Sequence, residues 1–308
     1  MERVAEPLRA LGARIETTDG HAPIIVTGGS LEGAVVTPSV SSAQVKSAVL
    51  LAGVDAGGTT TVQEAVRTRD HTERALAALG APVERHERSV SVRRFQHEGF
   101  SASVPGDPSS AAFLVAAAAI TGSSITIVDV GLNPTRTRFL DVMGRMGIET
   151  ELVVRREELG EPVGDIHVRP APGIDAVRVE PDELPLVIDE VPVLAALAAH
   201  APADSWFLGA GELRVKESDR LDGLGDGIRA LGGQAAVEGD DLVVAGGGLE
   251  GGLAVAHGDH RMAMAFAVSA LGARGIVEVD GMESADVSFP GFARTLSSLG
   301  ASIDPVPG

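Results

Sequence analysis

The feature that most constrains the fold of this chain is a helix-ending glycine that recurs at nearly regular intervals. The segments LRALGARIE, LAALGAPVE, MGRMGIETE, IRALGGQAAVE and LSSLGASID each end a helical pattern on glycine and lead into a strand pattern. These glycines are Gly12, Gly80, Gly147, Gly232 and Gly300, with spacings of 68, 67, 85 and 68 residues. Glycine ends helices because it adopts the left-handed conformation without steric strain. A repeat of this length predicts one supersecondary unit that is used several times.

The same order of patterns returns between these glycines. An apolar helix pattern precedes a β-rich strand, a polar loop, a second helix that ends on glycine, and a closing strand or hairpin; the four helices are AQVKSAVLLAG, SAAFLVAAAAI, EVPVLAALAAH and HRMAMAFAVSAL. We therefore expect an α/β fold of repeated strand–helix units. The opening MERVAEPLRALG is typical of the second helix of such a unit, so we expect the front of that unit to be missing.

Composition excludes several classes of protein. The 308 residues predict two domains, and an aromatic content of 3% requires a core of alanine, valine and leucine. The lack of cysteine excludes disulfides, thiolate metal sites and a cysteine nucleophile within this chain. A net charge of −18 opposes nucleic-acid binding. No apolar run reaches the roughly 18 residues of a membrane span, and no signal-peptide pattern is present, so we expect a cytoplasmic protein.

Polar side chains gather where helices are expected to begin, and free N–H groups at such positions attract anions. In ELRVKESDRL, Lys216 and Arg220 are four residues apart and are predicted to share a helix face, with the carboxylate of Glu217 beside them. This set suits an anionic ligand together with a proton-transfer group. A solvated helix face with internal ion pairs is the alternative.

Two further helix starts carry carboxylates. In GDHRMAMAF, Asp259, His260 and Arg261 lead into an apolar helix, and Arg261 is a candidate for binding a carboxylate. In LVIDEVPV, Asp189 and Glu190 lie between apolar runs, where a carboxylate is either a helix N-cap or a general base. Capping remains an alternative for Asp259 as well.

The remaining helix starts have more ordinary explanations. In PSVSSAQVK, Ser42 and Gln44 offer neutral hydrogen-bonding groups near Lys46, although Ser42 also suits an N-cap. Arg69 precedes the helix start in VRTRDHTE, where a capping role for Asp70 or Thr72 is an adequate explanation of the polar residues. PGDPSSAAF is interpreted as structural, with Asp107 as N-cap and proline at the first helical position. No HExxH, P-loop or dinucleotide-binding glycine pattern is present, so metal and nucleotide functions are not favoured.

Six of these motifs, taken together, resemble the 5-enolpyruvylshikimate-3-phosphate synthases of the enolpyruvyl transferase family. They occur in the family's order between about residues 36 and 294: SAQVKSAVLLAG, TRDHTE, VPGDPSSAAF, NPTRTR, RVKESDRL and DHRMAM. The resemblance implies βαβαββ units arranged in two domains as an inside-out α/β barrel, with the active site in the cleft between them. Residues 1–104 would then be the remainder of the first domain, and residues 105–308 the second.

The activity implied by the resemblance is transfer of the enolpyruvyl group of phosphoenolpyruvate to the 5-hydroxyl of shikimate 3-phosphate, with release of phosphate, in aromatic amino-acid biosynthesis. No metal or organic cofactor is implied. By motif position, Asp189 resembles the base, and Glu217 the acidic group beside the reacting methylene, assisted by Lys216. The implied ligands of shikimate 3-phosphate are Ser42, Gln44, Arg69, Asp189 and Lys216. Those of phosphoenolpyruvate are Gln44, Arg220, His260 and Arg261.

The sequence departs from the family pattern in two places. Val287 replaces a lysine that many relatives carry before the proline of the last loop. The family's opening segment, of about 110–130 residues, has no counterpart here. We therefore expect activity to need that segment, supplied by a separately encoded partner.

Two alternatives remain at the level of sequence. The chain is either this enzyme or a non-catalytic α/β fragment or scaffold that keeps partial ligand binding. Within the enzyme class, the related UDP-N-acetylglucosamine enolpyruvyl transferase is the other candidate. The motifs RVKESDRL and SAQVK favour the shikimate enzyme.

Overall fold

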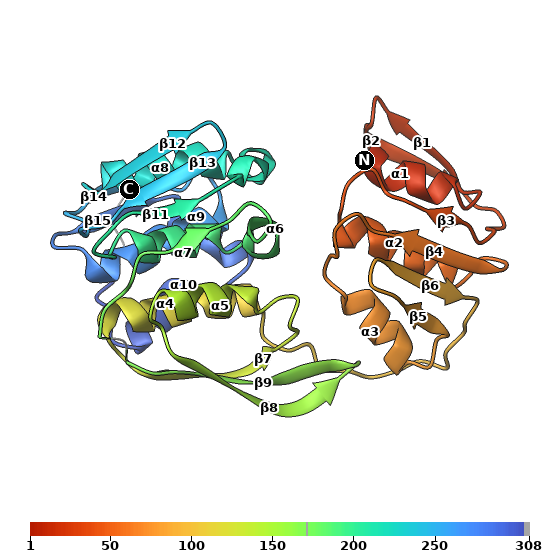
Figure 1. Cartoon of the computed structure of the whole chain (residues 1–308), viewed down its shortest axis with the longest axis horizontal. Coiled ribbons are helices and arrows are strands. Elements are labelled where there is room, and N and C mark those ends of the chain that lie inside the picture. The colour runs from red at the N-terminus through yellow and green to blue at the C-terminus, as the bar shows by residue number, and fades with distance from the viewer. Residues whose placement is uncertain (171, 305–308) are drawn as a thin grey trace. The chain divides into compact units, whose positions relative to one another are not determined.

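A computed structural model describes residues 1–170 and 172–304 (Figure 1). They form two compact units. Unit 1 comprises residues 1–104 together with 156–163, and unit 2 comprises residues 105–155 and the described residues from 164 onward. Both units mix helices with sheets, so the predicted α/β class is confirmed.

The elements of unit 1 follow the predicted order. They are α1 (Glu2–Arg9), β1 (Arg14–Thr18), β2 (His21–Thr27), β3 (Val35–Val36), α2 (Ala43–Gly53), β4 (Thr59–Gln63), α3 (His71–Ala78), β5 (Val83–Arg85) and β6 (Ser89–Arg93). The strands β1 and β2 pair as an antiparallel hairpin.

The elements of unit 2 repeat this order. They are α4 (Pro108–Thr121), β7 (Ile125–Gly131), α5 (Arg138–Arg145), β8 (Thr150–Glu158), β9 (Glu161–Val168), β10 (Arg178–Val179), α6 (Leu184–Val187), α7 (Val191–Ala198), β11 (Ser205–Phe207), η1 (Ala210–Val215), α8 (Arg220–Ala230), β12 (Gln234–Glu238), β13 (Asp241–Ala245), β14 (Gly252–Val255), α9 (His260–Ser269), η2 (Ala270–Gly272), β15 (Val277–Asp280), η3 (Met282–Val287) and α10 (Phe292–Ser298). The turn that joins β8 to β9 lies in the segment assigned to unit 1.

Two four-stranded sheets show that the repeat is structural. The orders β3-β4-β6-β5 and β10-β11-β13-β12 are equivalent. In each, the first two strands are parallel and the other pairs are antiparallel. The sheet β7-β9-β8 has the same order, and a parallel bridge from Gly106 to Val130 takes the place of its first strand. The predicted βαβαββ unit is therefore confirmed.

The five helix-ending glycines all adopt the expected conformation. Gly12, Gly80, Gly147, Gly232 and Gly300 have φ between +78° and +107°. An L side chain is strained in this region, whereas glycine is not. These residues therefore end each second helix and redirect the chain into the strand that follows.

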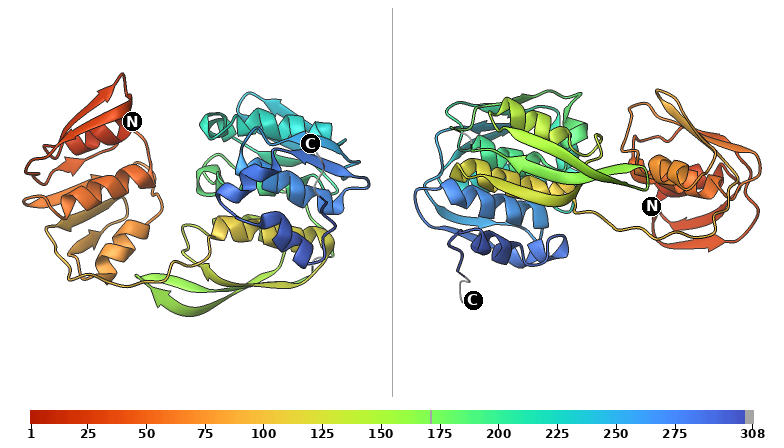
Figure 2. Two further views of the ribbon diagram at one scale, coloured as in Figure 1. Left: turned by 180° about the vertical axis from the view of Figure 1, so that it is seen from behind. Right: turned by 90° about the horizontal axis from the view of Figure 1, so that it is seen from below.

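The core of unit 2 is built from alanine-rich helices. The helices α4, α7 and α9 pack against one another. The helix α10 lies beside α4 (Figure 2). The rings of Phe113 in α4 and Phe292 in α10 are 6.1 Å apart. Most residues of α4, α7 and α9 are buried. No helix within residues 1–170 and 172–304 is long and apolar enough to span a membrane.

One glycine allows α8 to approach α9 closely. A Cβ atom at Gly227 would lie 2.1 Å from Cζ of Phe266. We expect Gly227→Ala to lower the free energy of unfolding by about 1–3 kcal/mol through overpacking. In contrast, a Cβ at Gly144 in α5 meets no atom within 4 Å. Gly144→Ala should therefore stabilise by about 0.5–1 kcal/mol. Urea unfolding measures both, and equal effects would contradict this packing.

The partly buried His200 is expected to lower the stability of the protein in mild acid. Burial lowers the pKa of His200, whose Nε2 donates to the carbonyl oxygen of Ser269 at 2.9 Å. As pH falls below about 6.5, the unfolded chain takes up a proton that the folded chain resists, so stability decreases. We expect His200→Gln to flatten the pH dependence of the unfolding free energy between pH 7 and 5. Parallel curves for the two proteins would refute this.

Candidate active site

The guanidinium of Arg220, the first residue of α8, is the centre of the site. The helix begins there because Asp219 caps it, accepting from the amide of Asp222 at 3.1 Å. Arg220 is 0% exposed. Its Nε donates to Asp259 Oδ2 at 2.7 Å and its Nη2 to Asp259 Oδ1 at 3.1 Å. Such two-point pairing holds the guanidinium in one orientation.

The carboxylate of Asp259 caps a helix in addition to pairing with Arg220. It caps α9 by accepting from the amide of Arg261 at 2.9 Å, and it also accepts from Ser218 Oγ at 3.1 Å. Burial alone would raise the pKa of Asp259, but the hydrogen bonds and charge of Arg220 hold that pKa below its usual value. The sequence predicted helix capping as an alternative role for Asp259. The structure shows that Asp259 also forms an ion pair with Arg220.

Two further carboxylates lie near Arg220. Its Nη2 is 2.6 Å from Glu217 Oε2, and its Nη1 is 4.0 Å from Asp189 Oδ1. Lys216 Nζ lies 3.5 Å from the same Asp189 oxygen. Glu217 is half-exposed, whereas Asp189 and Lys216 are largely covered.

Arg261 completes this group of charged residues. Its Nη1 donates to the backbone carbonyl of Asp189 at 3.0 Å. We call the set the Asp189 cluster, and it contains three carboxylates and three cations: Asp189, Lys216, Glu217, Arg220, Asp259 and Arg261. The structure brings these six residues together, and their roles in binding and catalysis stay predictions.

The prediction that Lys216 and Arg220 share a helix face is wrong. Lys216 follows η1 with an extended backbone, and α8 begins only at Arg220. The cause is Asp219, whose side chain caps α8 and leaves the preceding residues outside the helix. The two cations still meet at Asp189, although through the fold of the loop rather than through helical spacing.

His260 is the first residue of α9 and is partly buried. Burial and the nearby positive charge of Arg261 lower the pKa of His260, which favours the neutral imidazole. A neutral ring offers both a donor and an acceptor to a ligand. No group of three or more His, Asp or Glu side chains in the described part of the chain is arranged to hold a metal ion.

Glu190 follows Asp189 and is almost fully buried. It occupies the N-cap position of α7, but its side chain does not cap the helix and instead accepts from Ser109 Oγ. Burial raises the pKa of Glu190. Asp107 does cap α4 as predicted, accepting from the amide of Ser110 at 3.0 Å, with Pro108 at the first helical position.

The unit 1 candidates lie on α2 and on the loop before α3. Ser42 and Gln44 are at the start of α2, and Ser42 makes no side-chain cap, contrary to that alternative. Arg69 is partly buried, in the loop that precedes α3. Lys46 is the residue that joins the two segments.

Lys46 is 1% exposed and its two carboxylate partners are buried as well, so its ammonium is not available to a ligand, whereas Arg220 has the exposed partner Glu217. Its Nζ lies 2.7 Å from Glu73 Oε1 and 3.1 Å from Glu64 Oε2, and it donates to the carbonyl of Thr68 at 3.5 Å. Glu64 in turn accepts from the amide of Thr68 at 3.1 Å. Lys46 therefore fixes the loop that carries Arg69 against the helix that carries Ser42 and Gln44.

Removing the Lys46 ammonium should destabilise the protein strongly. Lys46→Met leaves Glu64 and Glu73 buried without their cation, and breaking a buried ion pair in this way costs about 3–5 kcal/mol. As a control, Arg93→Met removes an exposed pair with Glu84 and should change stability by less than about 0.5 kcal/mol. Urea unfolding compares the two. Similar small losses would show that the buried cluster is not needed.

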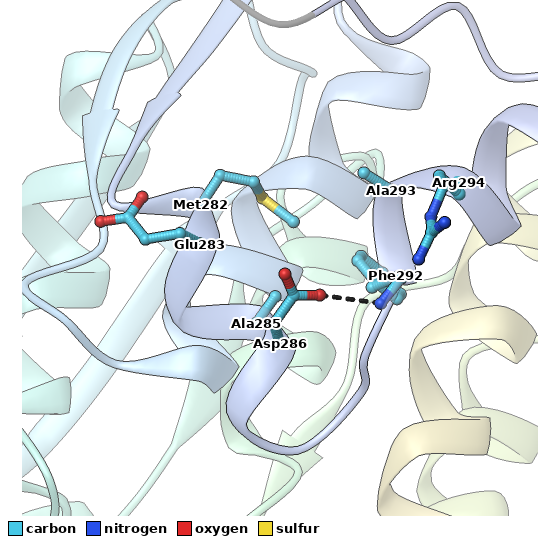
Figure 3. Close-up of a pocket in the computed structure, with 8 residues that line it drawn as sticks. Met282, Glu283, Ala285, Asp286, Phe292, Ala293 and Arg294 are labelled. Carbon is cyan, nitrogen blue, oxygen red and sulfur yellow. Dashed lines mark hydrogen bonds between the residues drawn. The ribbon is translucent and has the colours of Figure 1, made fainter.

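A hollow elsewhere in unit 2 is separate from these residues. It is lined by residues of η3 and α10, among them Met282, Asp286 and Arg294, and none of its lining residues belongs to the Asp189 cluster (Figure 3). Asp286 accepts from the amide of Gly291 at 2.7 Å, so this carboxylate organises the loop. Val287, where many family members carry lysine, is in η3 with an exposed side chain.

Comparison with known proteins places these residues in a family context. Residues 1–296 match the model of the family described as EPSP synthase (3-phosphoshikimate 1-carboxyvinyltransferase). A 3-phosphoshikimate 1-carboxyvinyltransferase of Acidithiobacillus ferrooxidans is 45% identical over 99% of this chain and 70% of its own length. One of Thermus thermophilus is 46% identical over 98% of this chain and 71% of its own. The solved EPSP synthase of Acinetobacter baumannii is 38% identical, with a TM-score of 0.90 over 99% of this chain and 71% of its own.

Proposed function

The chain belongs to the EPSP synthase family, and on that premise we propose that the Asp189 cluster serves the transfer of the enolpyruvyl group from phosphoenolpyruvate to the 5-hydroxyl of shikimate 3-phosphate, with release of phosphate. The family resemblance predicted from the six motifs is confirmed. The relatives named above are shikimate-pathway enzymes, which favours this activity over the UDP-N-acetylglucosamine alternative. The observation that carries the proposal is the meeting of three carboxylates and three cations from the segments around the starts of α7, α8 and α9.

The reaction adds the acceptor to phosphoenolpyruvate and then eliminates phosphate. In the addition, the cluster offers a carboxylate for each of two proton transfers: one proton leaves the 5-hydroxyl as its oxygen bonds to the enol carbon, and another reaches the methylene, which becomes a methyl group. In the elimination, the methyl group loses a proton, the enol double bond re-forms and the carbon–oxygen bond to phosphate breaks. We assign the first proton to Asp189, which Lys216 and Arg220 approach from two sides. We assign the second to Glu217, with Lys216 assisting as the neighbouring cation.

Arg220 and Glu217 suggest how substrate binding prepares the acid. In the structure the carboxylate of Glu217 pairs with Nη2 of Arg220, and the side chain of Glu217 is 54% exposed. The carboxylate of phosphoenolpyruvate competes for the same donor, because guanidinium prefers planar carboxylates. Binding then releases Glu217 from Arg220 and frees it to act at the methylene.

The remaining assignments follow the charges of the two substrates. Arg220 and Arg261 are the cations for phosphoenolpyruvate, with His260 and Gln44 as neutral partners. Shikimate 3-phosphate is assigned to Lys216 and Asp189 of unit 2, and to Ser42, Gln44 and Arg69 of unit 1. The assignment of Arg69 is supported by the contacts of Lys46, which fix the loop that carries Arg69. A cytoplasmic location stays a prediction.

The two carboxylates are expected to differ in their kinetic signatures. Asp189→Asn should lower kcat by about 10²–10⁴-fold with little change in KM, because it removes a proton acceptor. Glu217→Gln should lower kcat similarly and also lower the KM for phosphoenolpyruvate, since a neutral amide competes less well for Arg220. Steady-state phosphate release measures both. Asp222→Asn, which removes a carboxylate paired with Arg214, is the control. Loss confined to KM would contradict both roles.

The activity itself is tested by phosphate release from phosphoenolpyruvate with either acceptor. We expect turnover with shikimate 3-phosphate in at least one of the mixtures described here, and turnover with UDP-N-acetylglucosamine in none of them. A parallel reaction adds, as a separate polypeptide, the part of the Thermus thermophilus relative that this chain does not span, which tests the predicted partner segment. Ligand binding without turnover in every mixture would support the scaffold alternative and overturn the proposal.

A further inference from the structure

Four polar residues outside the Asp189 cluster form a connected group. Ser109 Oγ donates to Glu190 Oε1, and Nη2 of Arg136 donates to Ser109 Oγ at 2.7 Å. The same Nη2 donates to Asp107 Oδ1 at 2.9 Å. These residues come from three motifs, PGDPSSAAF, NPTRTR and LVIDEVPV, which meet at the N-termini of α4 and α7.

The group is attached to the residue next to Asp189. The amide of Glu190 donates to the carbonyl of Val187 at 2.8 Å, and the carbonyl of Glu190 accepts from Leu194 at 3.0 Å. On the other side of the same peptide bond, Arg261 donates to the carbonyl of Asp189 at 3.0 Å. The backbone that carries Asp189 is therefore held from both sides, by its own cluster and by Ser109 through Glu190.

Helix capping does not account for Glu190. Its side chain makes no cap hydrogen bond, so α7 gains none of the usual benefit of a polar N-cap. A buried carboxyl is costly to desolvate, and an apolar residue of similar size packs at a lower cost. The raised pKa of Glu190 reflects that burial. What the side chain does supply is a directional link from Ser109 to the backbone beside Asp189.

We propose that Glu190, Ser109 and Arg136 are positioning residues that hold the Asp189 carboxylate in place beside Lys216. The inference rests on the proposed function, since it assigns the group a role in turnover through Asp189. Displacing a reacting group by about 1 Å costs on the order of 10²-fold in rate, whereas ground-state binding through other contacts is retained. Loss of the group should therefore lower kcat and leave KM nearly unchanged.

The test compares four variants. Ser109→Ala and Glu190→Ala break the link, and each should lower kcat by about 10²-fold with KM within about twofold. Glu190→Gln keeps an oxygen that accepts from Ser109 and should restore most of the turnover. Ser205→Ala is the matched control, because it removes another buried serine of unit 2 that accepts from the amide of Val177 at 3.1 Å. The control should lose stability without losing kcat.

The outcomes separate this inference from the proposed function. If the unchanged protein turns over and Ser109→Ala matches Ser205→Ala in kcat, the positioning role is refuted. An equal loss in Glu190→Gln and Glu190→Ala also refutes it. If the unchanged protein shows no turnover in any mixture, the proposed function fails, and crystal structures decide the positioning role. The distance of 3.5 Å from Asp189 Oδ1 to Lys216 Nζ should lengthen in Ser109→Ala and persist in Ser205→Ala. An unmoved Asp189 overturns the inference.

Discussion

The buried ion pair between Arg220 and Asp259 is the interaction on which the site depends. A guanidinium without solvent is costly unless its donors are used, and here Asp259 accepts from two of them. Asp259 also caps α9, so one carboxylate fixes the starts of two helices. Glu217 and Asp189 are placed through their contacts with this guanidinium. Without the pair, the remaining charges would have no common centre.

In unit 1 the buried cation Lys46 has a structural role. Lys46 is enclosed by Glu64 and Glu73 and has no access to a ligand, so its charge organises a loop rather than a substrate. The two cations lie at different points of the repeat, because Lys46 is on α2, the first helix of its repeat, and Arg220 begins α8, the second helix of its repeat. The parallel first strands of each unit require a helical crossover, and that crossover brings helix starts and polar loops to the same edge.

Much of the fold was predictable because its signals are local. The helix-ending glycines and the apolar helix patterns act within a few residues, and Asp107 caps α4 as its motif indicated. The start of α8 was misplaced because Asp219 competes for the helix terminus, which periodicity alone does not register. Ser42 was a reasonable N-cap by type, yet its side chain makes no cap bond. The contact of Ser109 with Glu190 joins residues 81 positions apart, and no local pattern signals it.

The sequence by itself determined the repeated α/β architecture, the family, and the residue types available for chemistry at helix starts. Those properties depend on spacing and on residue identity, which a single chain displays directly. Only the tertiary structure decided which charges meet. In the structure Arg220 pairs with Asp259, and the exposed side chain of Glu217 contacts the same guanidinium. Lys46 is buried and is not accessible to a ligand. Electrostatic partners are chosen by distance and burial, and both are set by packing between segments that lie far apart in the chain.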